Sequence, residues 1–234
     1  MLVSVHLPKT AGTSFRQLLE SCFGERLLVD YADRPLHSAI ASRRLRALRG
    51  AVSRNLRPDR LREVDAVHGH FLAIKYVRWR GAGQYRRVTW LRDPVERLAS
   101  HYHYWRRTFD PSSAGDLHRR MIDEDWSLEA FCLSPELRNI YCQFLWGVPL
   151  SRFDFVGITE HFATDIDDFA RDLLPPGVLQ AHHAPEALNG NPGARSVYVT
   201  DADFRLRIER FHAADVRLYQ EALTLRTRRL KAGH

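Results

Sequence analysis

A lysine, a glycine and three hydroxyl side chains are gathered in one short segment near the start of the chain. The segment reads Pro8-Lys9-Thr10-Ala11-Gly12-Thr13-Ser14. It follows an apolar run at residues 2–5 and precedes a helical pattern of apolar residues at 15, 18 and 19. A strand, a short turn and a helix in this order favour phosphate binding, because the N–H groups and the dipole of a helix N-terminus attract anions. Lys9 precedes the glycine, so the segment departs from the Walker A order, in which the lysine follows the second glycine.

Two further segments carry side chains suited to the same site. Arg92 and Ser100 lie in Leu91-Arg92-Asp93-Pro94-Val95-Glu96-Arg97-Leu98-Ala99-Ser100-His101-Tyr102, directly after a predicted strand. His68 and His70 lie between this segment and the first, in Val67-His68-Gly69-His70-Phe71. Arginine can bind a phosphate through two hydrogen bonds, and a neutral imidazole can accept a proton near neutral pH. In an extended chain the two histidines point to the same face. These residue types could bind an anion and accept a proton.

In combination and order these segments resemble the sulfotransferases that use 3′-phosphoadenosine 5′-phosphosulfate (PAPS). The first segment is similar to their 5′-phosphosulfate loop, and the Arg92 segment to their 3′-phosphate motif. The His-Gly-His stretch is similar to that of the heparan and uronyl 2-O-sulfotransferase branch, whose histidines include the catalytic base. The resemblance runs from about residue 3 to residue 222. It implies a P-loop-like three-layer α/β/α fold with a central, mostly parallel sheet.

The resemblance also implies a reaction and a role for each residue. The sulfuryl group of PAPS would pass in line to a hydroxyl of a carbohydrate or glycoconjugate acceptor, with 3′-phosphoadenosine 5′-phosphate as the product nucleotide. Pro8, Lys9, Thr10, Ala11, Gly12, Thr13 and Ser14 would hold the 5′-phosphosulfate, and Arg92 and Ser100 the 3′-phosphate. Lys9 would stabilise the leaving phosphate, and His70 would be the general base, with His68 as a second base or an orienting partner. No metal is required, because cationic side chains can stabilise a phosphate leaving group.

Some assignments have alternatives within the sequence. Other branches use a carboxylate as the base, which leaves Glu63, Asp65 and Glu160 open. Arg92 could instead pair with Asp93 or Glu96, and the aromatic residues 102, 104 and 105 could line the site or belong to the core. His101, His103 and the pair at 182–183 raise the question of zinc. We do not expect a metal, because a spacing of two on a helix separates the ligands and no cysteine has metal-site spacing.

Two other classes of function compete with the sulfotransferase. A P-loop kinase or nucleotide hydrolase would need a Gly-Lys-Ser/Thr end to its loop, which is missing, and an acidic Mg²⁺ ligand, which Asp65 could supply. A nucleic-acid-binding module is the other, because eight arginines lie between Arg43 and Arg62. We prefer a solvated helix face there and expect no nucleic acid partner. The acceptor could be anionic, and a lipid-linked acceptor would bring the protein into peripheral contact with a membrane.

Composition is typical of a folded domain with an affinity for anions. The 234 residues carry a net charge of +7, and 44% of them are hydrophobic. Only three of the 35 cationic residues are lysines, so a lysine in the phosphate loop is informative. Neither a signal peptide nor an apolar run of the roughly 18 residues that a membrane span needs is evident. Three cysteines without a close pair predict no disulfide framework. Animal relatives of the family that the chain resembles carry a Golgi membrane anchor, so the resemblance implies a stand-alone bacterial version in the cytoplasm.

The apolar periodicity predicts one domain, residues 1–234, of alternating strands and helices. The expected strands are residues 2–6, 27–29, 65–68, 88–91 and 153–158. The expected helices are residues 12–21, 38–51, 94–107, 116–123, 127–133, 136–146, 159–174 and 201–229. Asp93, Thr159 and Asp201 are the expected N-caps, and Pro94 is the expected first helical residue. Residues 182–196 are rich in Pro, Gly and Asn, and this composition predicts a long loop.

Overall fold

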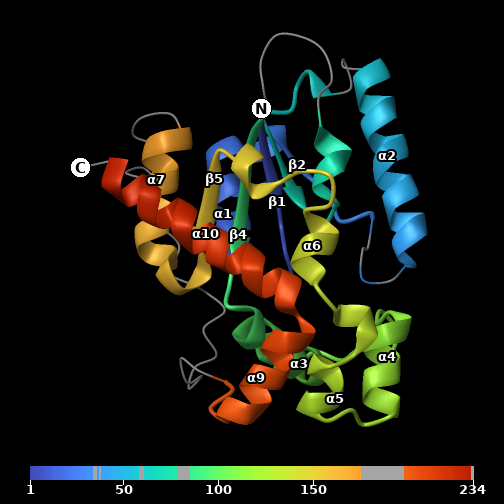
Figure 1. The fold of residues 1–234 in the computed structure, drawn as a ribbon. Helices are drawn as coiled ribbons and strands as arrows, with labels where there is room; N and C mark the ends of the chain where they lie inside the picture. The colour runs from blue at the N-terminus through green and yellow to red at the C-terminus, as the bar shows by residue number, and fades with distance from the viewer. Residues whose placement is uncertain (34–35, 37, 58–60, 78–84, 175–197, 233–234) are drawn as a thin grey trace.

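A five-stranded parallel sheet forms the centre of the computed structural model, which describes residues 1–33, 36, 38–57, 61–77, 85–174 and 198–232. The strands are β1 (Leu2–Val5), β2 (Leu27–Val29), β3 (Ala66–Gly69), β4 (Arg86–Leu91) and β5 (Phe155–Ile158). They lie in the order β2-β3-β1-β4-β5 (Figure 1), with Leu2 in register with both Ala66 and Arg86. Strands β1, β3 and β5 are buried along their whole length, as parallel strands covered on both faces must be. All five predicted strands are confirmed.

Helices cover both faces of the sheet, which makes the predicted three-layer α/β/α fold. Helices α1 (Gly12–Phe23) and α7 (Phe162–Leu173) lie on one face. Helices α6 (Ile140–Phe144) and α10 (Ala213–Ala232) and the 3-10 turn η4 (Ala73–Tyr76) lie on the other, and α2 (Ile40–Leu56) packs on η4. Alternate strand residues separate the two cores: Leu2, Val88 and Phe155 face α1 and α7, whereas Val3, Leu91 and Val156 face α6 and α10.

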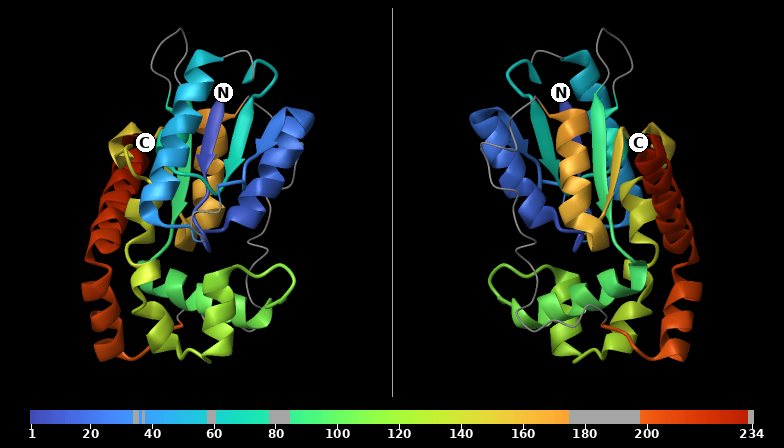
Figure 2. Two further views of the ribbon diagram at one scale, coloured as in Figure 1. Left: turned by 90° about the vertical axis from the view of Figure 1, so that its right-hand side faces the viewer. Right: turned by 90° about the vertical axis from the view of Figure 1, so that its left-hand side faces the viewer.

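A group of short helices lies beyond the carboxyl ends of the strands (Figures 1 and 2). It contains α3 (Pro94–Arg107), α4 (Asp116–Asp123), α5 (Leu128–Cys132) and α9 (Ala202–Phe211). Helix α3 has the predicted limits, and the predicted cap is confirmed, since the Asp93 carboxylate accepts hydrogen bonds from the N–H groups of Val95 and Glu96 at 3.0 Å. This group faces the sheet edge at which β1, β3 and β4 end, so it can close a site there.

Two long predicted helices are broken, and the same contact breaks both. Residues 136–146 hold the 3-10 turn η5 (Pro135–Leu137) and α6, separated by Asn139 at a left-handed φ of 53°. The expected helix 201–229 is interrupted at His212, between α9 and α10, although Asp201 caps α9 as predicted. The Nδ1 atom of His212 accepts a hydrogen bond from the Asn139 N–H, and its Nε2–H donates to the Cys132 carbonyl. Buried polar pairing therefore overrides helix periodicity.

One predicted cap is wrong, and one predicted loop is not described. Thr159 begins the 3-10 turn η7 (Thr159–His161), and no side chain caps either η7 or α7. The predicted loop at 182–196 lies outside the described residues.

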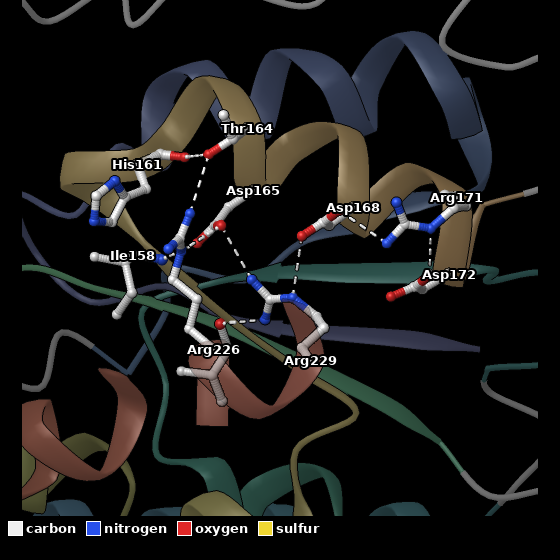
Figure 3. A network of polar contacts seen from close by, with 10 residues as sticks. Ile158, His161, Thr164, Asp165, Asp168, Arg171, Asp172, Arg226 and Arg229 are labelled. Carbon is white, nitrogen blue, oxygen red and sulfur yellow. Dashed lines mark hydrogen bonds and ion pairs between the residues drawn. The ribbon is translucent and has the colours of Figure 1, made fainter. Parts of the chain in front are cut away.

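A buried carboxylate joins α10 to α7 (Figure 3). Asp165 is fully buried, and its carboxylate accepts a hydrogen bond from the Ile158 N–H at 2.8 Å. It also pairs with Nε of Arg226 at 2.7 Å and with Nη2 of Arg229 at 3.1 Å. The contact ties the last described helix to the end of β5, so it fixes one side of the sheet.

Replacing Asp165 with Ala should lower the free energy of unfolding by about 3 kcal/mol, because it leaves an N–H and two partly buried arginines without their shared partner. Urea unfolding followed by fluorescence measures this. The matched control is Asp172→Ala, which removes a carboxylate from the exposed pair with Arg171 and should cost less than about 0.5 kcal/mol. Equal losses in the two variants would contradict the structural role of Asp165.

Candidate functional site

A cavity of about 890 Å³ lies between the carboxyl ends of the strands and the group of short helices. Chain segments that follow β1, β3 and β4 line one side of it, and α3 with residues 113–115, the loop before α4, lines the other. In parallel sheets ligands bind at this edge, beside the strand at which the connections change direction. Nine of the residues predicted for the site line the cavity, on one side or the other: Pro8, Lys9, Ala11, Gly12, Thr13, Ser14, His70, Arg92 and Ser100. Thr10 and His68 do not line it.

The loop between β1 and α1 is shaped by two left-handed residues. Lys9 has a φ of 66° and Ala11 a φ of 59°, and neither is a glycine. Left-handed residues within a turn can direct successive N–H groups to one concave side, which is an anion-binding arrangement. Helix α1 begins immediately afterwards, with no side-chain cap and no acidic residue in its first turn. The positive end of its dipole therefore faces the cavity without a neutralising carboxylate.

Thr10 stabilises the loop from inside. Its side chain is buried, and its hydroxyl donates a hydrogen bond to the Leu7 carbonyl at 2.9 Å. The hydroxyl proton is thus used within the loop, whereas Thr13 and Ser14 lie on the cavity wall.

Lys9 is a partly buried cation among other cations. Its Nζ lies 4.0 Å from the centre of the Tyr104 ring, a cation–π contact. Burial, with the nearby charges of Arg92 and Arg107, lowers the pKa of Lys9 to about 8. The charged form is therefore destabilised in the absence of an anion, and an anion in the cavity would stabilise it.

Arg92 is positioned by its backbone and not by the carboxylates beside it in sequence. The Tyr141 hydroxyl donates to the Arg92 carbonyl at 2.6 Å and accepts from the Arg92 N–H at 3.2 Å. Asp93 and Glu96, the alternative partners, both pair with Arg205, at 2.5 and 3.1 Å. Within the described part of the chain Arg92 makes no ion pair. Its guanidinium remains on the cavity wall with Ser100.

The orientation of His70 is set by a hydrogen bond to the backbone. Its Nδ1 lies 2.7 Å from the His6 carbonyl oxygen. A carbonyl can only accept, so Nδ1 carries the proton and Nε2 is the basic nitrogen of the neutral ring. The ring also stacks on His6, with centroids 4.3 Å apart, and meets the edge of Tyr31 at 4.8 Å. These contacts hold an imidazole in a defined tautomer at the cavity wall.

His68 lies deeper than the sequence pattern implied. It is buried, its Nδ1 is 2.8 Å from the Ser4 hydroxyl, and its ring stacks on His6 at 4.9 Å. Burial, the largest cause, lowers its pKa to about 3, so the ring is neutral at physiological pH. Strand β3 ends at Gly69, so the expectation that the two histidines share one face does not apply beyond that point. His68 lies under His6, away from the cavity wall.

The cavity also contains residues that the sequence pattern did not assign to it. His6 and Tyr31 line it, joined by a 3.0 Å hydrogen bond between Nδ1 and the hydroxyl. His6 directly follows β1, and Tyr31 closely follows β2. Their position after a strand is the feature of the sequence that could have placed them at the cavity. Of the three aromatic residues that the sequence left between cavity and core, Tyr104 and Trp105 line the cavity, whereas the Tyr102 hydroxyl donates to the Trp126 carbonyl. His101 lines it too, with a pKa lowered mainly by burial.

No acidic side chain lines the cavity within the described residues. Asp65 precedes β3, at the opposite edge of the sheet from His70, and pairs with Arg26. Glu63 precedes the same strand, and the Glu160 carboxylate accepts a hydrogen bond from the Asp93 N–H. The described residues contain no group of three or more His, Cys, Asp or Glu side chains arranged to hold a metal ion.

Comparison of the chain with protein-family models and with curated proteins gives no match. Among the helices in the described ranges, none is long and apolar enough to cross a membrane.

Proposed function

We propose that the chain is a sulfotransferase that transfers the sulfuryl group of PAPS to a hydroxyl of a carbohydrate or glycoconjugate. The observation that carries the proposal is the charge of the cavity wall. It combines Lys9, Arg92 and the uncapped N-terminus of α1, and its described residues include no carboxylate. PAPS presents a phosphosulfate and a separate 3′-phosphate, so it needs two groups of cationic or hydrogen-bond-donating residues. The cavity wall offers two such groups. They are the loop of Lys9 and the pair Arg92 and Ser100.

The residues on the wall fit the requirements of this transfer. An acceptor oxygen would form a bond to sulfur while the bond from sulfur to the phosphate oxygen breaks, and the electron pair would leave with the phosphate. Lys9 and the N–H groups at the start of α1 would stabilise the negative charge on that phosphate. The proton of the acceptor hydroxyl would pass to Nε2 of His70, whose Nδ1–H is held by the His6 carbonyl.

The test is calorimetric titration with 3′-phosphoadenosine 5′-phosphate in the absence of Mg²⁺. Lys9→Ala and Arg92→Ala should each weaken binding by about 10- to 100-fold, because each removes a charge-assisted contact to phosphate. Arg106→Ala is the matched control, since that arginine is exposed and paired with Asp125 outside the cavity, and it should bind like the wild type.

The same titration has a pH dependence with a defined sign. Lys9 must be charged to bind phosphate, and its pKa in the free protein is about 8. Wild-type affinity should therefore fall by about tenfold from pH 7 to pH 9, and Lys9→Ala should lose this fall. Tight binding of ATP–Mg²⁺ in place of the product nucleotide would reject the proposal in favour of a kinase or hydrolase.

A further inference from the structure

Helix α2 presents its large apolar side chains to solvent. Figure 1 shows it at one side of the molecule, and it faces the viewer in the left view of Figure 2. Its buried residues are Ala47, Ala51 and Arg43, on the side that packs on the protein. The outward row is Leu45, Leu48, Val52 and Leu56, with exposed fractions of 49%, 40%, 40% and 76%. A helix on a globular protein normally has the reverse arrangement.

The outward row is continuous. Its members are three, four and four residues apart, which places them on one face of a helix. Together with Arg49, Ser53 and Arg57 they line a shallow hollow of about 570 Å³. A contiguous exposed apolar surface of this kind marks a binding surface more often than scattered single residues do.

Two arginines, Arg44 and Arg49, flank the row, and α2 contains no acidic residue. The helix carries five arginines in 17 residues, at positions 43, 44, 46, 49 and 54. Arg43 does not belong to the surface patch expected from the sequence, because it is buried and donates to the Ser38 carbonyl and to Gln143. The Arg44 guanidinium lies 4.7 Å from the centre of the Trp146 ring. An apolar row with a cationic border and a neighbouring tryptophan is typical of helices that lie in a lipid interface.

We propose that α2 docks this protein on the surface of an anionic lipid bilayer, with Leu45, Leu48, Val52 and Leu56 inserted among the acyl chains near the headgroups. A nucleic acid would match the arginines but would leave the apolar row exposed. A second copy of the helix would bury the row but would bring two sets of arginines together. An anionic bilayer satisfies both the row and its border. The proposal is independent of the reaction in the cavity.

Cosedimentation with vesicles tests the proposal. Vesicles of equal parts phosphatidylglycerol and phosphatidylcholine should bind the full chain, and pure phosphatidylcholine should bind it at least about tenfold more weakly. The double variant Leu48→Glu/Val52→Glu should reduce binding to the anionic vesicles by about 100-fold, because two inserted side chains become charged. Both positions are exposed, so thermal unfolding should show the variant to be folded. The matched control is Leu206→Glu on α9, whose leucine is 44% exposed, and it should bind like the wild type.

Three results would overturn the proposal. The first is the absence of wild-type binding to anionic vesicles at physiological ionic strength. The second is equal loss of binding in the double variant and the Leu206→Glu control. The third is a concentration-dependent dimer or an RNA complex that requires Leu48 and Val52 while vesicles do not bind, since the apolar row would then serve that partner.

Discussion

His70→Asn is expected to lower kcat for sulfuryl transfer by a factor of about 10² to 10⁴, the usual contribution of a positioned general base. Asparagine can keep the hydrogen bond to the His6 carbonyl through its amide N–H, which occupies the place of Nδ1–H. It has no group equivalent to the basic Nε2. The substitution therefore removes the proton acceptor while it preserves the orienting contact, and affinity for 3′-phosphoadenosine 5′-phosphate should stay within about threefold of wild type.

Single-turnover kinetics with PAPS and an acceptor found by screening would measure this effect, and calorimetry on the same preparation would measure nucleotide binding. The informative comparison is with His68→Asn and Glu160→Gln, which alter two of the other candidate bases. A larger loss of kcat in either of them than in His70→Asn would move the base to that residue. Loss of nucleotide binding in His70→Asn would show instead that the ring is needed to shape the cavity.

Acidification from pH 7.5 to pH 5 is expected to lower the free energy of unfolding by at least about 3 kcal/mol. Burial lowers the pKa of His68 to about 3 and that of His212 to about 4, from an ordinary value of 6.5. In the unfolded chain both take up protons below pH 6.5, whereas in the folded protein they stay neutral. Each histidine therefore contributes stability above pH 6.5 that is lost as the pH falls. The loss from each amounts to about 2 kcal/mol by pH 5. His6 and His101 shift in the same direction.

One group opposes this trend. Burial raises the pKa of Asp215 to about 6, so the folded protein binds a proton there before the unfolded chain does. This restores about 1 kcal/mol between pH 7.5 and pH 5, less than the histidines lose. The net sign is thus set by the histidines.

Urea unfolding at the two pH values measures the difference. His68→Asn should remove about 2 kcal/mol of the pH dependence, because asparagine does not titrate. The matched control is His161→Asn, which makes the same substitution at an exposed histidine. An unchanged pH dependence in His68→Asn would mean that this ring is not kept neutral by the fold.

The sheet and the position of the cavity could be predicted from the sequence because they depend on local patterns. Short apolar runs gave the strands, and Asp93 with Pro94 gave the start of α3 to the residue. The loop of Lys9 and the segment of Arg92 lie together because both follow strands of one parallel sheet. Parallel strands place all such segments at the same edge.

The remaining features depend on contacts between distant residues, which no local pattern encodes. The break at His212 needs Asn139 and Cys132, which are far from it in sequence. The separate environments of His68 and His70 follow from the position at which β3 ends. The place of Tyr31 on the cavity wall depends on its hydrogen bond to His6. Tertiary contacts determine the helix break and the positions of these side chains, and the periodicity of the sequence could not predict them.

Gly12 and the His6 imidazole are in close steric contact in the loop between β1 and α1. A Cβ on Gly12 would lie 1.6 Å from the Nε2 atom of His6, so a side chain at position 12 requires the imidazole to move or to be replaced. In a diverging lineage a substitution of Gly12 would therefore involve position 6 as well. Either change at position 6 would disturb the ring on which His68 and His70 stack. Evolutionary drift in the phosphate loop is thereby linked to the histidine cluster, and each constrains the history of the other.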